Sequence, residues 1–168
     1  MSRKRVPEPE VPIPTSGAFD LVAEDYDRLM KGVGYPMWVS YYRLLLATRG
    51  FTPKRLLDIA CGTGTMAEML RKEGFQVTGV DISPPMIEVA RRKATKRKSQ
   101  NRYEVGDART FDLGEEFDAA YSWFDSLNNI IEPAGLFAAF QRAFAHIRSG
   151  GSWIFDLNLA YAFEKRMF

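Results

Sequence analysis

The strongest constraint on the fold is a short apolar segment that runs directly into a glycine turn. Residues 55–60 (RLLDIA) have the composition of a buried strand, and Gly62 and Gly64 follow at once. A helical pattern continues from residue 65 to about residue 73, where Gly74 is a suitable C-terminal cap. The sequence therefore predicts a strand, a tight turn and a helix in immediate succession.

The same unit recurs along the chain. Residues 75–81 (FQVTGVD) have a strand pattern, Ser83 is a suitable N-cap and Pro84 fits the first helical position. Strands are also expected at residues 102–106, 117–123 and 152–157, and before the last of them a long helix with a buried stripe made of Leu136, Phe137, Phe140, Phe144 and Ile147. This alternation predicts an α/β fold, a three-layer sandwich around a mainly parallel, Rossmann-like sheet whose ligands bind at the carboxyl ends of the strands.

The 168 residues suffice for one globular domain. Residues 1–16 hold four of the nine prolines, so we expect a flexible tail and then a domain at residues 17–168, which opens with two helices near residues 19–30 and 38–46. No apolar run approaches the roughly 20 residues of a membrane span, and charges stand where a signal peptide is apolar. We therefore expect a cytoplasmic protein with no membrane partner. One Cys and one His form no zinc-binding pattern.

A run of basic residues crosses the middle of the chain without an intervening acid. It could form a nucleic-acid patch if its charges were focused on one surface, or it could be the solvated face of an amphipathic helix. We favour the solvated face and expect no nucleic-acid partner. The run consists of Arg91, Arg92, Lys93, Lys96, Arg97, Lys98 and Arg102.

The glycine turn fits two kinds of ligand. Gly62, Gly64 and Ala67, with Asp81 at the end of the next strand, match the dinucleotide fingerprint of NAD-dependent oxidoreductases. Asp58 argues against a dinucleotide, because its carboxylate would face a pyrophosphate in a partly dry crevice. S-adenosylmethionine carries a sulfonium and an ammonium and no phosphate, so Asp58 could hold its amino end and Asp81 its ribose hydroxyls. Alternatively, Asp58 only caps the turn.

Four segments in this order resemble the class I S-adenosylmethionine-dependent methyltransferases, and in particular their small-molecule branch. The segments are LLDIACGTG (56–64), the acid that ends FQVTGVD (75–81), the Gly-Asp-Ala step at 106–108 and FDAAYSWFDSLNNI (117–130). The resemblance implies transfer of a methyl group to N or O of a small-molecule acceptor by in-line displacement, with S-adenosylhomocysteine as product. The alternatives are the NAD-dependent oxidoreductase and a noncatalytic module that binds S-adenosylmethionine.

The resemblance also implies roles for individual residues. Asp107 would accept a hydrogen bond from the adenine amino group with the Ala108 main chain nearby, and Ile82 and Met86 would flank the adenine or ribose. Ala60 departs from the glycine of most relatives, which narrows the approach to the methionine carboxylate. The remaining expected cofactor contacts are a cover formed by Tyr26, Tyr35 and Trp38 and a wall formed by Trp123 and Phe124, although these aromatic residues could equally belong to the core.

Asp125 and Asn128, after the fourth strand, are the candidates for orienting the acceptor. Methyl transfer needs no nucleophilic residue and no metal, because the sulfonium already activates the methyl carbon. Asp156 and Asn158 could ligate Mg²⁺ as in catechol-type relatives, but we expect no metal.

Similar enzymes continue through a sixth and a seventh strand, whereas this sequence stops at Phe168 after the fifth. We therefore expect strands six and seven to be absent, the fifth strand to lie at an open edge, and a homodimer to form through that edge.

Overall fold

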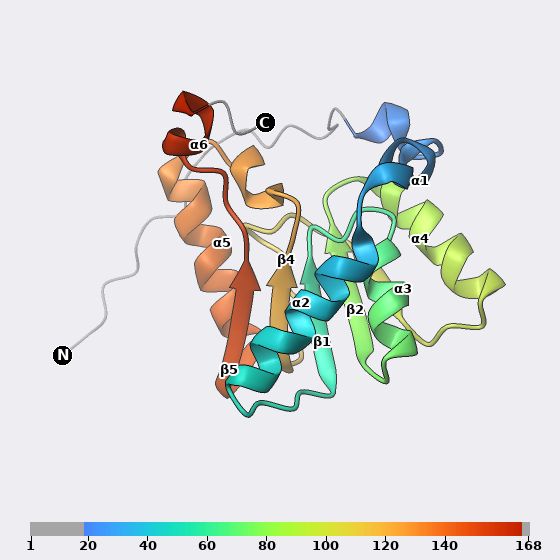
Figure 1. The fold of residues 1–168 in the computed structure, drawn as a ribbon, viewed down its shortest axis with the longest axis horizontal. Helices are drawn as coiled ribbons and strands as arrows, with labels where there is room; N and C mark the ends of the chain where they lie inside the picture. Colours follow the sequence, from blue (N-terminus) through green and yellow to red (C-terminus); the bar gives the residue numbers. More distant parts are fainter. Residues whose placement is uncertain (1–18, 166–168) are drawn as a thin grey trace.

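A computed structural model describes residues 19–165, and the expected tail at residues 1–16 lies outside them. Five strands form one parallel sheet in the order β3-β2-β1-β4-β5 (Figure 1), which confirms the predicted Rossmann-like α/β fold. The strands are β1 (Arg55–Ile59), β2 (Gln76–Asp81), β3 (Arg102–Val105), β4 (Phe117–Ser122) and β5 (Ile147–Phe155).

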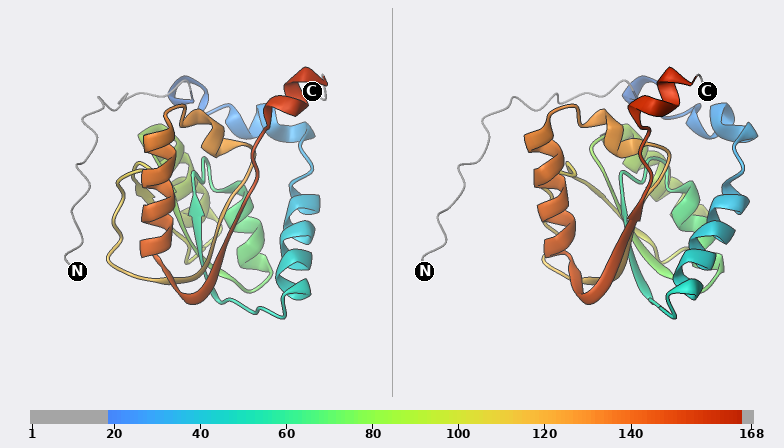
Figure 2. Two further views of the ribbon diagram at one scale, coloured as in Figure 1. Left: turned by 90° about the vertical axis from the view of Figure 1, so that its left-hand side faces the viewer. Right: turned by 60° about the vertical axis from the view of Figure 1, so that its left-hand side comes forward.

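Helices cover both faces of the sheet, and Figure 2 shows α2 and α5 on opposite sides of it. None of the helices within residues 19–165 combines the length and the apolar character needed to cross a membrane. The helical elements are η1 (Asp20–Val22), α1 (Tyr26–Leu29), η2 (Met30–Gly32), α2 (Tyr35–Thr48), α3 (Thr65–Lys72), α4 (Pro84–Lys96), η3 (Ser126–Asn129), α5 (Pro133–Ala145) and α6 (Ala160–Glu164).

Two separate cores follow from the alternation of side chains along the strands. Leu56 of β1 belongs to the core that α2, α3 and α4 cover, whereas Leu57 and Ile59 belong to the core on the α5 face. Asp58 shares the face of Leu56, and Tyr121 of β4 pairs with it in register. The sheet therefore delivers Asp58 to its carboxyl end on the α2 side.

Local signals account for the starts of the two central helices. Gly64 takes a left-handed conformation (φ 72°) immediately before α3. The Ser83 side chain accepts a hydrogen bond from the Met86 amide (3.3 Å), and Pro84 occupies the first position of α4, as predicted.

The predicted buried stripe of α5 is wrong. The helix buries Gly135, Ala139 and Ala143, while Phe144 is 83% exposed and Phe137 also faces outward; Phe140 is partly exposed and packs on Trp153 and Phe155 of β5. Small side chains four residues apart let the helix lie close to the sheet, which turns the aromatic side chains away from the core. Ile147 is not in this helix but begins β5, five residues earlier than expected.

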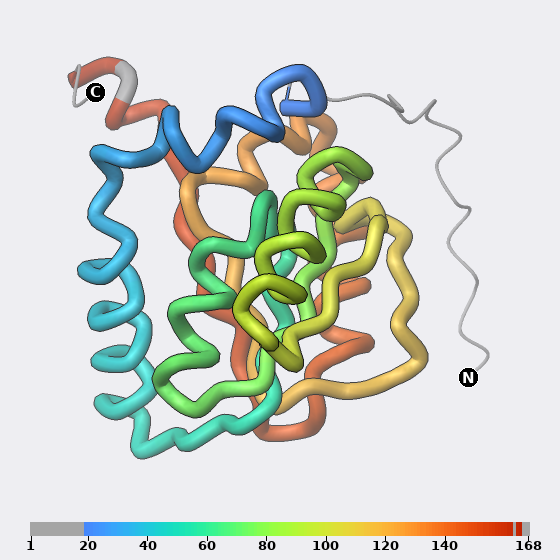
Figure 3. The backbone as a smooth tube through the Cα atoms, turned by 90° about the vertical axis from the view of Figure 1, so that its right-hand side faces the viewer, coloured from blue at the N-terminus to red at the C-terminus, as the bar shows by residue number. Residues whose placement is uncertain are grey.

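The predicted first helix, near residues 19–30, is divided into η1, α1 and η2. This segment crosses the carboxyl ends of the strands (Figures 1 and 3). Within it, Ala23 is buried, and Val22 and Tyr26 pack against Met86 and Val89 of α4. A segment with so few apolar anchors follows the surface beneath it and does not form one continuous helix.

Candidate functional site

A cavity of about 40 Å³ lies at the carboxyl ends of β1 and β4, beneath the N-terminal segment. It includes seven of the predicted donor-binding residues. The lining residues are Tyr26, Tyr35, Asp58, Ala60, Cys61, Gly62, Thr63, Thr65, Met66, Tyr121, Trp123, Phe124 and Ser126.

Asp58 is the acidic group of this cavity. Its side chain is 3% exposed, and the Tyr121 hydroxyl donates a hydrogen bond of 2.9 Å to it. Burial raises the pKa of Asp58 to about 8; the bond from Tyr121 opposes this shift and the nearby Asp81 adds to it. A positively charged ligand would favour the ionised carboxylate and would therefore lower the pKa of Asp58 again. The site is therefore suited to an ammonium or sulfonium group.

The turn after β1 bends through three left-handed residues, Ala60 (φ 66°), Gly62 (φ 52°) and Gly64 (φ 72°). Glycine adopts this conformation freely, whereas an alanine pays about 1–2 kcal/mol for it. The Ala60 and Cys61 amides both donate to the Val80 carbonyl, at 2.8 and 3.0 Å. These bonds tie the strained turn to β2.

Asp81, at the end of β2, is held in a fixed orientation beside this turn. One oxygen accepts from the Gly62 amide (2.8 Å) and the other from the Ser83 amide (3.0 Å). Burial raises the pKa of Asp81, and the two amide hydrogen bonds oppose that shift. Each carboxylate oxygen keeps a lone pair free, so both can also accept from the two hydroxyls of a ribose.

The remaining residues expected at the adenine end do not line the cavity. The two carboxylate oxygens of Asp107 accept hydrogen bonds from Nε and Nη2 of Arg109, at 2.9 and 2.6 Å. Burial opposes ionisation of Asp107, but Arg109 outweighs it and lowers the pKa of Asp107. Ala108 lies against the core of the α5 face, Ile82 is exposed, and Met86 is buried beneath the N-terminal segment. Their contacts with a donor stay predictions.

Aromatic residues from three elements close the other side of the cavity. Tyr26 of α1 and Tyr35 of α2 line it, whereas Trp38 packs behind Trp123 and Phe124, with ring centroids 5.0 and 5.4 Å apart. Trp38 therefore supports the wall from behind.

Phe124 and Asp125 follow β4 in a strained conformation, with φ values of 62° and 50°. The Asp125 amide donates to Asp156 (3.0 Å), and Asp125 accepts from the Asn158 side chain (2.9 Å). Asn128 exchanges two bonds of 3.0 Å with Asn158. Asp125 and Asn128 thus join the loops after β4 and β5, while Phe124 and Ser126 line the cavity. The acceptor-orienting roles of Asp125 and Asn128 stay predictions.

Within residues 19–165, no group of three or more His, Cys, Asp and Glu side chains is arranged to hold a metal ion.

Sequence reasoning missed several polar groups at the site. Thr63 and Thr65 line the cavity, and both bind Asp27 of α1 and Lys93 of α4. Thr63 and Thr65 stand next to the glycines of the turn, so the sequence could have identified them as site residues. Lys93 lies in a run of basic residues, yet its side chain is only 16% exposed. The solvated-face interpretation of that run is therefore wrong for Lys93.

Comparison with known proteins decides the family. Residues 56–151 match the family described as "Methyltransferase domain". The chain belongs to this methyltransferase family. This membership favours S-adenosylmethionine over a nicotinamide dinucleotide at the glycine turn.

Three relatives illustrate the family. A dTDP-3-amino-3,6-dideoxy-alpha-D-glucopyranose N,N-dimethyltransferase of Streptomyces fradiae is 34% identical over 132 residues, 77% of this chain and 50% of its own length. The crystal structure of an S-adenosylmethionine-dependent methyltransferase from Clostridium acetobutylicum matches 89% of this chain and 61% of its own, with a TM-score of 0.77 and 27% identity. An amino pentose methyltransferase from Micromonospora echinaspora, solved with S-adenosylmethionine bound, matches 81% and 56%, with a TM-score of 0.70 and 29% identity. The chain spans about half the length of the curated relatives it matches, 57% and 55% of the first two.

Proposed function

We propose that the chain binds S-adenosylmethionine and forms the donor-binding part of an enzyme that methylates a nitrogen atom of a small-molecule acceptor. The observation that carries this proposal is the buried carboxyl of Asp58 in a cavity beside the glycine turn. The relatives that act on amino sugars support nitrogen as the methylated atom.

S-adenosylmethionine supplies a methyl group that its sulfonium already activates. Asp58 holds the ammonium of the methionine end, and Asp81 accepts hydrogen bonds from the ribose hydroxyls. Tyr26, Tyr35 and Phe124 exclude water from the side of the cavity where the acceptor approaches. The acceptor lone pair attacks the methyl carbon in line with the carbon–sulfur bond, whose electrons pass to sulfur, and the methylated amine then loses a proton. The protein supplies alignment and a dry environment.

Thermal unfolding tests donor binding. We expect S-adenosylhomocysteine to raise the unfolding midpoint, because a ligand that binds the native state stabilises it, and we expect NAD to leave the midpoint unchanged. Stabilisation by NAD alone would contradict the proposal and favour an oxidoreductase.

Transfer of a labelled methyl group then separates an enzyme from a noncatalytic binding module. We expect label in an amino sugar nucleotide and none in a phenol. Label in the phenol alone would refute nitrogen as the acceptor atom, and donor binding with no transfer to any acceptor would favour the noncatalytic module.

We also propose that two copies of the chain associate through β5. Among residues 19–165 this strand lies at the edge of the sheet; Phe140 packs against Trp153, with ring centroids 4.9 Å apart, and lines a surface hollow together with the exposed Phe144. Exposed apolar edges of this kind favour association. In sedimentation, Phe144→Glu should shift a dimer toward monomer, whereas the control Leu21→Glu, at an exposed apolar residue of η1, should not. A wild-type protein that stays monomeric at high concentration would refute the proposal.

A further inference from the structure

The N-terminal segment has unusually little apolar anchorage for a cover over a binding site. We call residues 19–34 the cover segment; Figure 3 shows it crossing the carboxyl ends of the strands and reaching α4. Within it Ala23 is fully buried, while Val22, Tyr26, Met30 and Val33 are only partly buried against the domain. Polar contacts therefore add to the few apolar contacts that hold this segment in place.

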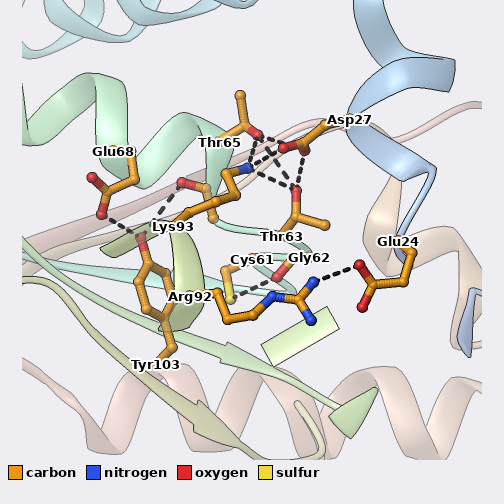
Figure 4. Close-up of polar contacts among 11 residues, drawn as sticks. Glu24, Asp27, Cys61, Gly62, Thr63, Thr65, Glu68, Arg92, Lys93 and Tyr103 are labelled. Carbon is orange, nitrogen blue, oxygen red and sulfur yellow. Dashed lines mark hydrogen bonds and ion pairs between the residues drawn. The ribbon is translucent and has the colours of Figure 1, made fainter. Parts of the chain in front are cut away.

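One cluster, drawn in Figure 4, provides such contacts. Asp27 of the cover segment lies 2.5 Å from the Lys93 ammonium and accepts hydrogen bonds from Thr63 (2.5 Å) and Thr65 (3.0 Å). Lys93 also donates to Thr65 at 2.7 Å. We call these four residues the Asp27 clamp. It joins the cover segment, the turn before α3, and α4.

The position of the clamp shields it from solvent more than an ordinary surface ion pair, although burial also lowers the pKa of Lys93 and the hydrogen bond to Asp27 opposes that shift. Thr65 is the first residue of α3, so the Asp27 carboxylate lies at the positive end of that helix. Burial opposes ionisation of Asp27, but the hydrogen bonds from Lys93 and Thr63 outweigh it and lower the pKa of Asp27. A partly buried, charge-assisted pair of this kind is screened less by solvent than an exposed one.

A second ion pair joins the same two elements and provides a comparison. Arg92 of α4 lies 2.5 Å from Glu24 of the cover segment, but these side chains are 59% and 71% exposed. Exposed pairs contribute little, about 0–1 kcal/mol. Neither residue lines the cavity.

We propose that Lys93 is a positioning residue for donor binding, which it serves by holding Asp27 in place and thereby keeping the adjacent Tyr26 over the cavity. This inference rests on the proposed function. Tyr26, Thr63 and Thr65 all line the cavity, so the clamp forms part of its rim. The cavity of about 40 Å³ is far smaller than the roughly 300–1,000 Å³ of small-molecule sites. We therefore infer that the cover segment shifts to admit the donor and returns to retain it, and that the clamp stabilises the position over the cavity.

Dissociation of S-adenosylhomocysteine from the unaltered chain and its variants tests this role. Lys93→Met keeps the length of the side chain and removes its charge, so we expect dissociation to accelerate by about tenfold or more. Asp27→Asn should have a similar effect, and the double variant should add little to either, because both changes break one interaction. Lys93→Arg retains the charge and should stay within about threefold of wild type. The control Arg92→Met should change the rate by less than about twofold.

A second measurement needs no donor. Cys61 lines the same cavity, is partly exposed and is the single cysteine of the chain, so the rate at which a thiol reagent modifies it reports access to the cavity beneath the cover segment. We expect Lys93→Met to accelerate this reaction and Arg92→Met to leave it unchanged. Unchanged Cys61 modification and unchanged dissociation in Lys93→Met would overturn the clamp while leaving the proposed function intact. If the wild-type chain fails to bind S-adenosylhomocysteine, the proposed function and the role of Lys93 toward the donor both fail, whatever the rate of Cys61 modification.

Discussion

Asp58→Asn should weaken binding of S-adenosylmethionine by about thirtyfold or more, since removing one partner of a buried charge pair costs about 2–5 kcal/mol. Asparagine has nearly the same shape as aspartate, and its amide oxygen can still accept the hydrogen bond from Tyr121. The fold should therefore persist while the charge that faces the donor ammonium is lost. Titration calorimetry of both proteins at pH 9, where the wild-type carboxyl is ionised, measures the difference.

The same substitution should change how stability depends on pH. The pKa of Asp58 rises from 3.8 to about 8 on folding, so the native protein holds this proton over a range in which the unfolded chain has lost it. The contribution of this proton to the free energy of unfolding is complete below pH 3.8 and is lost as pH rises toward about 8. Asparagine removes this dependence. Denaturant unfolding at pH 9 should therefore find Asp58→Asn more stable than wild type, and the advantage should shrink toward pH 5.

Donor affinity should show the opposite dependence on pH. Below a pKa of about 8, a cationic donor must displace the Asp58 proton in order to bind, so wild-type affinity should fall by up to tenfold for each further pH unit. The affinity of Asp58→Asn should be low and independent of this ionisation.

Glu68→Gln is the matched control for Asp58→Asn, because Glu68 is a buried carboxyl on α3 that does not line the cavity. It should leave donor affinity within about threefold of wild type. If Asp58→Asn bound the donor as tightly as wild type, or if both variants lost binding equally, the assignment of Asp58 would be wrong.

The parts of the fold that sequence predicted have strong local signals. The strand before Gly62, the left-handed Gly64 and the Ser83 cap each depend on neighbours within a few residues. The orientation of α5 depends instead on how the helix packs against the sheet. Aromatic side chains have the larger apolar surface, so the pattern favoured burying Phe137, Phe140 and Phe144, but close packing of helix against sheet selected the small residues.

The residues of the candidate site also divide into those that the sequence predicts and those that it does not. Asp58 and Asp81 stand at strand ends in the sequence, so their common location follows from the topology of a parallel sheet. Asp27 and Lys93 are 66 positions apart and meet only because the cover segment crosses α4. Lys93 also lies among six other basic residues, and only its helical spacing from Val89 and Ala90 places it beside the apolar face of α4. Its pairing required the tertiary structure.

Gly64→Ala should destabilise the protein by about 3 kcal/mol, which combines about 1–2 kcal/mol for a left-handed alanine with about 1–3 kcal/mol for overpacking. A Cβ atom at this position would lie 2.6 Å from the Tyr103 ring. The ring has no room to retreat, because Tyr103 is buried and its hydroxyl donates to Glu68 at 3.0 Å (Figure 4). Denaturant unfolding gives the free-energy difference directly.

Gly50→Ala separates the two contributions. Gly50 has a similar φ of 60° but no heavy atom within 4 Å of the added Cβ, so its substitution should cost only the conformational term of about 1–2 kcal/mol. The excess at Gly64 then measures the contact with Tyr103, and Tyr103→Leu should recover part of it in the double variant. Equal losses of stability in Gly50→Ala and Gly64→Ala would show that the Tyr103 ring moves aside to make room for the added methyl group. In that case close packing against Tyr103 would not explain why a glycine stands at the start of α3, and φ alone would have to account for it.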